Sequence, residues 1–329
     1  MGVLSGLIDA GGKNRSTLAD VEEGLFVSIG SRSSKITRFW VLLVLASIIA
    51  AGGVVGNSTP AVIGAMIMTP LATPLYGVAL SAVLGSRRHL RDALVLLAAG
   101  IAVSVLIGVL MALLTFDRMP LDANTQIVGR TTPAILDLVI AIAAGLAGAY
   151  ALVRRDVANI LAGVAIAITL VPVLEVAGIS LGSGRLDLAV GAFLLFLTNA
   201  AAIMLGGMIV FTAAGYERAA SRGPSRRHYA RFVVAALIIA VVVPLTVSSV
   251  RSYHYLRWVD ATAAASRTWV EGTGWHVTDV QRVGDEIVAT VIGQGSPPAT
   301  PDFRELVRRA VPEGVMVRLI ENNGTNVII

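Results

Sequence analysis

The sequence predicts an all-α polytopic membrane protein with seven membrane segments, followed by a small C-terminal α+β domain. Only 14% of the 329 residues are charged and 55% are hydrophobic, whereas a soluble domain has roughly 25% charged residues. The mean hydropathy is +0.78, and the abundance of glycine, with 33 residues, is typical of membrane helices. Several apolar runs reach the roughly 20 residues that a membrane-spanning helix needs.

The composition also excludes several kinds of site. The chain has no cysteine and four histidines, which excludes disulfides, thiolate metal sites, Cys nucleophiles and iron–sulfur clusters. We therefore expect no metal ion or cofactor, and no motif indicates an enzyme. The net charge of +5 arises in residues 36–250, which hold fourteen basic and eight acidic side chains. Because this excess lies in the hydrophobic region, it argues against nucleic acid as a partner.

The charges predict how the segments cross the bilayer. The apolar segments are residues 39–55, 60–84, 93–116, 134–153, 157–181, 188–214 and 232–250. Their connections alternate, with thirteen basic residues on one side and three on the other. The positive-inside rule makes the basic side cytoplasmic. We therefore expect a multi-pass protein of the prokaryotic inner membrane. Its N-terminal tail (1–35) would be cytoplasmic and loosely ordered over the first 24 residues, and its C-terminal domain (251–329) extracytoplasmic.

Residues 36–116 and 133–214 look like two copies of one three-helix unit. The middle segment of each copy is interrupted by proline, at Pro70 and Pro74 in the first copy and at Pro172 in the second. Matching Pro74 to Pro172 keeps the offset within about 97 to 99 residues. Because each copy crosses the membrane three times, the second copy is inverted. Inverted repeats with broken helices recur in secondary transporters.

Each proline break has two interpretations. Proline removes a helix hydrogen bond and clashes with the preceding turn, and the freed backbone groups must face protein or a wet cavity. A half-helix starting at Pro74 or Pro172 would present free N–H groups and a positive dipole end, which suits an anion. Alternatively, each proline is a structural kink that the neighbouring helices satisfy.

Two short runs in the repeat are distinctive. The first is G-N-S-T-P-A-V-I-G-A-M at residues 56–66, followed by the two prolines, and the second is A-G-V-A-I-A at residues 162–167, followed by V-P-V at 171–173. They resemble the signatures of the "uncharacterised hydrophobic domain" proteins of bacteria and archaea, catalogued as domain of unknown function 389. In that family, two adjacent prolines are common where this chain has Pro172 and Val173. The resemblance covers about residues 25–215. It implies a polytopic membrane core, often fused to soluble α/β domains, and implies no activity.

Glu175 is the only acid in the fifth segment and follows Pro172 by three residues. An ionisable side chain near mid-membrane is costly and indicates function by default, so Glu175 is a candidate proton carrier. The alternative is that Glu175 lies in the first turn of a half-helix and offsets its dipole. Asp137, at the start of the fourth segment, is interpreted first as an interfacial or first-turn acid, with a coupling residue as the alternative.

Other polar side chains near the breaks are candidates to line a path for a solute or ion. The run Asn57, Ser58 and Thr59 before Pro60 is interpreted first as a helix N-cap with proline at the first helical position, with substrate contact as the alternative. Threonines can instead bond their own helix backbone, and Asn199 can join helices rather than contact a ligand. Besides Glu175 and the three prolines, the candidates are Thr69, Thr73, Tyr76, Thr169, Asn57 and Asn199.

Residues 251–329 are balanced in charge and predict a small α+β domain. Helical spacing covers residues 253–270, alternation predicts strands at 275–283, 286–292 and 314–321, and a short helix is expected at 302–310. A last short strand is expected at 326–329. The order α-β-β-α-β resembles small BON-type modules, which are associated with envelope attachment.

The leading functional hypothesis is a transporter or channel for a small solute or ion, which uses the broken helices of the inverted repeat. The lipid bilayer is the expected environment, and the G-x-x-x-G at Gly52 and Gly56 favours close helix packing or a homo-oligomer. The alternative is a non-transporting membrane scaffold or sensor whose outer domain binds an envelope partner. A wet cavity that reaches the prolines and Glu175 would favour transport, whereas a solidly packed core would favour the scaffold.

Overall fold

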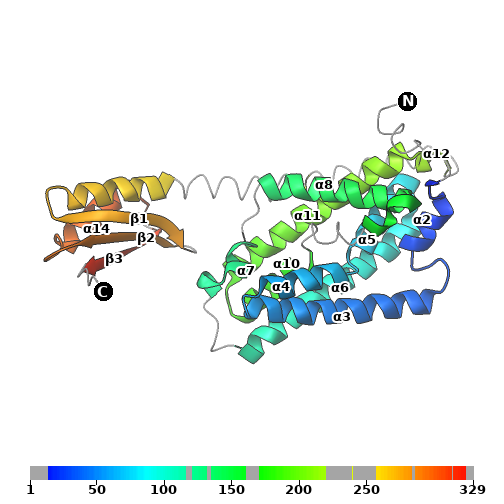
Figure 1. Ribbon diagram of the computed structural model, residues 1–329, viewed down its shortest axis with the longest axis horizontal. Helices are drawn as coiled ribbons and strands as arrows, with labels where there is room; N and C mark the ends of the chain where they lie inside the picture. Colours follow the sequence, from blue (N-terminus) through cyan, green and yellow to red (C-terminus); the bar gives the residue numbers. More distant parts are fainter. Residues whose placement is uncertain are drawn as a thin grey trace. The chain divides into compact units, whose positions relative to one another are not determined.

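The structure is a computed structural model of the chain (Figure 1). It describes residues 14–115, 121–131, 135–160, 170–219, 239, 257–283, 286–312 and 314–323. The chain divides into two compact units, Met1–Thr246 and Val247–Ile329. The first unit is helical, and the second combines helices with a three-stranded sheet.

The helical unit consists of apolar helices joined by short connections. Its described elements are α2 (Leu18–Leu25), α3 (Arg32–Val55), α4 (Thr59–Met68), α5 (Ala72–Leu84), α6 (Arg87–Thr115), η2 (Leu121–Ala123), α7 (Thr125–Val128), α8 (Ile135–Val153), η3 (Arg155–Ile160), α10 (Val171–Gly182), α11 (Leu186–Ala213) and α12 (Tyr216–Ala219).

Three of these helices, α3, α6 and α11, are long and apolar enough to cross a membrane. The pair α4 and α5 passes the same test when taken together, with a 45° bend at the break. Helices α8 and α10 are shorter and also apolar. The helical unit is therefore compatible with a membrane protein, as the composition predicted. The seventh predicted segment, apart from Ile239, and residues 161–169 of the fifth lie outside the described residues.

Glycine sets the distance between the central helices. Helices α8 and α11 pack together along one side of the unit, α3 and α6 along the other, and α10 contacts α3, α6 and α11 (Figure 1). Where α6 crosses α10, a Cβ added at Gly108 would lie 2.9 Å from the Cα of Gly178. Where α8 crosses α11, a Cβ added at Gly206 would lie 3.1 Å from the Cα of Gly145. Such small residues let helix backbones approach closely.

Two helix corners have the same backbone geometry at a constant spacing of 99 residues. Helices α5 and α10 begin at Ala72 and Val171, and α6 and α11 begin at Arg87 and Leu186. The first helix of each pair is followed within two residues by a glycine with positive φ, +64° at Gly85 and +74° at Gly184, a conformation that glycine adopts without a Cβ penalty. The residue after each glycine closes a Schellman motif through the bonds Ser86 N to Ser81 O and Arg185 N to Ser180 O, both 2.9 Å.

The expectation of a loosely ordered N-terminal tail is wrong for the described residues from 14 onward. Helix α2 begins at a capping box in which Thr17 and Asp20 exchange hydrogen bonds. Its apolar face is buried through Val21 and Leu25, and the helix contacts α5. The same short segment also contains the charged side chains of α2. Its average polarity therefore does not reveal that it forms a two-turn amphipathic helix.

The C-terminal unit is described by itself. A helix spans residues 257–270 and is followed by β1 (Trp275–Val283), β2 (Glu286–Gly293), α14 (Thr300–Ala310) and β3 (Met316–Asn323). Strand β1 pairs antiparallel with β2, and β2 pairs parallel with β3. Trp269, Trp275 and Phe303 lie in its core. The predicted order α-β-β-α-β is confirmed, and the predicted strand at 326–329 lies outside the described residues.

Candidate functional site

The first proline break lies between α4 and α5, at residues 69–71. Pro70 is in the break, whereas Pro74 lies in the first turn of α5, where the missing N–H of proline removes no helix hydrogen bond. The expected half-helix start at Pro74 is therefore wrong by two residues, because α5 already begins at Ala72. The Thr69 hydroxyl donates to the Ala65 carbonyl at 2.8 Å, which is the backbone-bonding alternative for this threonine.

A small cavity adjoins this break. It has a volume of about 40 Å³, and Pro70 and Thr73 line it together with Lys35 and Arg38. Lys35 is also held by backbone carbonyls, since its Nζ donates to the Ile29 oxygen at 2.6 Å. The cavity is about large enough for one water molecule, and it brings two basic side chains to the start of α5.

The second proline lies in the first turn of α10, which begins at Val171. Thr169 lies outside the described residues. Glu175 is the fifth residue of α10, and the first turn holds no acid. The interpretation of Glu175 as a first-turn acid that offsets the dipole is therefore wrong. Asp137 does lie in the first turn of α8, as predicted.

Glu175 is fully buried in the apolar unit, with 0% of its surface exposed. Neither carboxylate oxygen has a hydrogen-bond partner among the described residues. The Ser47 hydroxyl of α3 lies against the carboxyl without the geometry of a hydrogen bond. Ser47 instead pairs with Ser104 of α6, with 3.0 Å between the two hydroxyl oxygens. Both serines are also 0% exposed, so three polar side chains meet where α3, α6 and α10 pack together.

Tyr76 occupies a different contact, between α5 and α8. Its hydroxyl donates to the Gly145 carbonyl at 3.1 Å, and its ring would contact a Cβ added at Gly207 of α11. Tyr76 precedes Glu175 by 99 residues, the spacing of the two helix corners. Asn199 is buried on α11, and Thr198 beside it donates to its own helix at Leu194.

The predicted N-cap before Pro60 is confirmed at Ser58, whereas Asn57 has a different role. Residue Ser58 holds the N-cap position of α4 and makes no side-chain cap bond. The Asn57 side-chain oxygen accepts from the Thr125 hydroxyl at 2.8 Å and from the Gln126 backbone N–H at 3.4 Å. Asn57 itself has a φ of +47°, which asparagine tolerates better than most residues. It therefore fastens the α3–α4 corner to α7 rather than capping α4.

Sequence analysis missed two segments that hold helix ends. The Asn124 side chain donates to the Val54 carbonyl at 2.7 Å, near the end of α3. The Ser16 backbone N–H donates to the Val153 carbonyl at 2.8 Å, at the end of α8, and Val153 follows Val54 by 99 residues. The sequence feature that could have revealed each segment is an apolar residue among polar ones, and this residue is buried: Ile127 in one segment and Val21 in the other.

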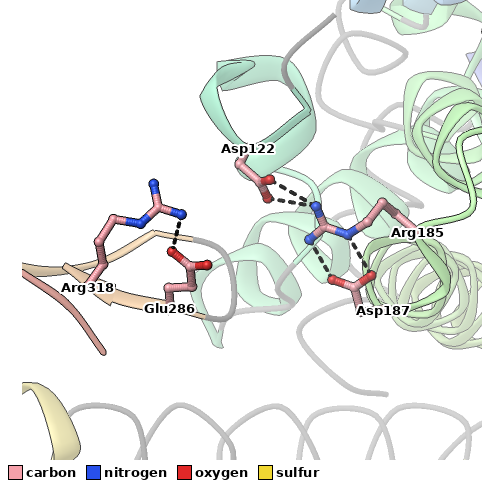
Figure 2. Close-up of polar contacts among 5 residues, drawn as sticks. All are labelled: Asp122, Arg185, Asp187, Glu286 and Arg318. Carbon is pink, nitrogen blue, oxygen red and sulfur yellow. Dashed lines mark hydrogen bonds and ion pairs between the residues drawn. The ribbon is translucent and has the colours of Figure 1, made fainter. Parts of the chain in front are cut away.

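Ion pairs fix the connections beside these segments. Arg185 binds Asp122 and Asp187 at once, with closest distances of 2.9 and 2.8 Å (Figure 2). The hydrogen bonds that Arg185 donates to Asp187 and Asp122 raise its pKa. Asp20 of α2 pairs with Arg155. Its hydrogen bonds with Thr17, followed by that with Arg155, lower the pKa of Asp20 to about 2.

The C-terminal unit holds a separate, larger groove between α14 and β3. Its volume is about 530 Å³, and it is lined mostly by valines and other apolar side chains, with Arg304 and Arg308 among them. Nothing in this groove forms a catalytic constellation.

Comparison with known proteins covers the region that contains Tyr76 and Glu175. The family model described as "Domain of unknown function (DUF389)" matches residues 66–205. An uncharacterised protein of Methanocaldococcus jannaschii is 29% identical over 208 residues, which are 62% of this chain and 63% of that protein. The match thus spans less than two thirds of the relative's length. The resemblance drawn from the sequence is confirmed, because residues 66–205 match the DUF389 family model.

Proposed function

We propose that this chain is a multi-pass transporter or channel for a small solute or ion, in which Glu175 carries a proton. One observation carries the proposal: Glu175 is fully buried in an apolar helical unit, and its oxygens have no hydrogen-bond partner among the described residues. Keeping an ionisable group there costs stability, and in membrane segments such groups mark ion and proton pathways.

The two matching corners support the inverted repeat on which the proposed transport depends. At a spacing of 99 residues, the corners share helix starts, glycine conformations and closing hydrogen bonds. The packing is reciprocal as well, since α10 contacts α6 and α5 contacts α11. Each break helix would then pack against the third helix of the other copy, an arrangement suited to rocking one copy against the other.

The membrane topology forms part of the proposal. We propose seven spans, with the basic connections in the cytoplasm and the C-terminal unit outside, as the positive-inside rule favours. The starts of α5 and α10 are the proposed contacts for an anionic solute, because helix N-termini attract negative charge. Lys35 and Arg38 line the cavity beside α5 and add positive charge at the start of this helix. Enzyme activity is not part of the proposal.

The test is a proteoliposome assay with a pH-sensitive dye inside the vesicles. An imposed pH gradient should collapse faster in vesicles that contain the protein, and Glu175→Gln should remove this acceleration. Asp92→Asn is the matched control, because Asp92 is an exposed acid on α6 beside Arg91, and this variant should retain the flux. Unchanged flux in Glu175→Gln would overturn the proton-carrier role.

A non-transporting scaffold or sensor is the second candidate. The close approach of backbones at Gly108 with Gly178, and at Gly145 with Gly206, is the observation that favours it, because such crossings leave no room for a path. In that case the C-terminal unit would bind an envelope partner. Reconstituted protein that collapses no gradient, with or without added anions, would favour the scaffold over the transporter.

A further inference from the structure

Three buried polar side chains from three helices meet in the helical unit. Glu175 comes from α10, Ser47 from α3 and Ser104 from α6, and each is 0% exposed. We propose that the Glu175 carboxylate and the two serine hydroxyls bind a small monovalent cation, for which sodium is the probe. This inference rests on the proposed function and names an ion for the same site.

The serine pair differs from two other buried hydroxyls of the unit, those of Ser81 and Thr198. Ser81 and Thr198 bond a carbonyl one turn back in their own helices, as hydroxyls in helices commonly do. Ser47 and Ser104 instead meet across two helices at 3.0 Å. A hydroxyl has one donor and two acceptor positions, so the pair keeps unused lone pairs beside the carboxyl.

The carboxylate supplies the charge that a cation would need. No basic side chain in the described part of the chain hydrogen-bonds to Glu175, so none of the described basic residues pairs directly with an ionised carboxylate there. A proton would let one carboxyl oxygen donate to a neighbouring acceptor, and would leave the other oxygen without a donor among the described residues. The carboxylate and both hydroxyls offer four oxygens from three helices, and oxygen is the ligand that hard cations prefer.

At the equivalent position of the α5–α6 corner, a buried polar side chain has a hydrogen-bond partner without an ion. Tyr76, 99 residues before Glu175, donates its own proton to the Gly145 carbonyl of α8 at 3.1 Å. Gly145 corresponds at the same spacing to Ala46, the neighbour of Ser47 on α3. The first corner thus has a built-in donor, whereas the second has an acid whose ionised form can only accept. A cation between Glu175 and Ser47 supplies the missing positive charge.

Thermal unfolding of the full chain in detergent tests the site. Sodium chloride should raise Tm against choline chloride at equal ionic strength, because a ligand of the folded state stabilises it by mass action. Glu175→Gln should abolish the sodium-dependent shift. Ser104→Ala should raise the sodium concentration at half-effect by about tenfold or more, a loss typical of weakened ion ligation. Ser81→Ala, at a buried serine remote from Glu175 in sequence, should keep the shift.

Equilibrium binding of radioactive sodium to the same proteins gives a second readout. Glu175→Asp keeps the charge and should bind sodium more weakly than the wild type. This variant still tests the site if Glu175→Gln fails to fold. A wild-type Tm that does not respond to sodium, or an equal response in Glu175→Gln, would overturn the site. If sodium has no effect while Glu175→Gln still abolishes proton flux, the cation site fails and the proposed function stands.

Discussion

The α5–α6 and α10–α11 corners have the same backbone and different chemistry. Both close with a left-handed glycine and the same hydrogen bonds, 99 residues apart. At the matching positions, the first corner has Tyr76 and Ser86 where the second has Glu175 and Arg185. In the first corner Tyr76 donates to the Gly145 carbonyl of α8 and Ser86 pairs with His89, whereas the second holds a buried acid without a hydrogen-bond partner among the described residues. We infer that the glycine-closed backbone is the scaffold, and that function resides in the side chains that differ.

The corners also differ in how closely their helices cross. Ala79 in α5 faces Gly207 in α11, and a Cβ added at Gly207 would lie 3.0 Å from the Ala79 methyl. At the equivalent position of α10, Gly178 faces Gly108 of α6 with no methyl on either side. Glu175 is therefore held about one turn from the tighter crossing.

The largest expected effect comes from adding a methyl at this tighter crossing. In Gly178→Ala, the new Cβ would overlap the Val105 backbone carbonyl, which cannot rotate away. Overpacking a core costs about 1–3 kcal/mol, occasionally more, so we expect a marked loss of folded protein and a lower Tm in detergent. Gly64→Ala is the control, because nothing lies within 4 Å of a Cβ there. An unchanged Tm in Gly178→Ala would contradict the tight crossing.

The second prediction compares Tyr76, whose hydroxyl has a hydrogen-bond partner, with Glu175, whose carboxylate oxygens have none among the described residues. Tyr76→Phe removes a hydrogen bond to the Gly145 carbonyl and should cost about 0.5–1.5 kcal/mol. Glu175→Gln in sodium-free buffer should leave the stability unchanged or raise it, because replacing a buried charge that lacks a partner removes a desolvation cost. Both are read as Tm in the same detergent. Equal losses in the two variants would mean that Glu175 has a stabilising partner.

Much of this arrangement could be predicted from local sequence patterns. Apolar runs located the long helices, alternation located β1 at its observed bounds, and a lone acid in an apolar run identified Glu175. These features depend on neighbours within a few residues. The contacts of Glu175 could not be predicted in this way, because Ser47 and Ser104 come from other helices and look like ordinary small residues. The contacts of Asn57 could not be predicted for the same reason, since its partners lie nearly 70 residues further along the chain.

The third prediction concerns the arginine of the second corner. Arg185→Ala breaks the ion pairs with Asp122 and Asp187 (Figure 2). All three side chains are partly exposed, and each such pair contributes about 0.2–1 kcal/mol. We expect a modest fall in Tm that shrinks at high salt, because salt screens exposed charges. Ser86→Ala at the equivalent position of the first corner should show no such salt dependence.

The smallest expected effect is a pH dependence at the segment before α3. Hydrogen bonds with Thr17, together with Arg155, lower the pKa of Asp20 to about 2, against about 3.9 in an unfolded chain. A carboxyl whose pKa is lowered by folding stabilises the protein above the unfolded pKa, and this contribution is lost as the pH falls toward the folded value. The wild type should therefore lose stability between about pH 4 and pH 2, and Asp20→Asn should lose less over that interval. Thr17→Ala removes the leading cause and should behave like Asp20→Asn in thermal unfolding. Identical slopes in all three proteins would show that the capping box does not hold α2 against the first corner.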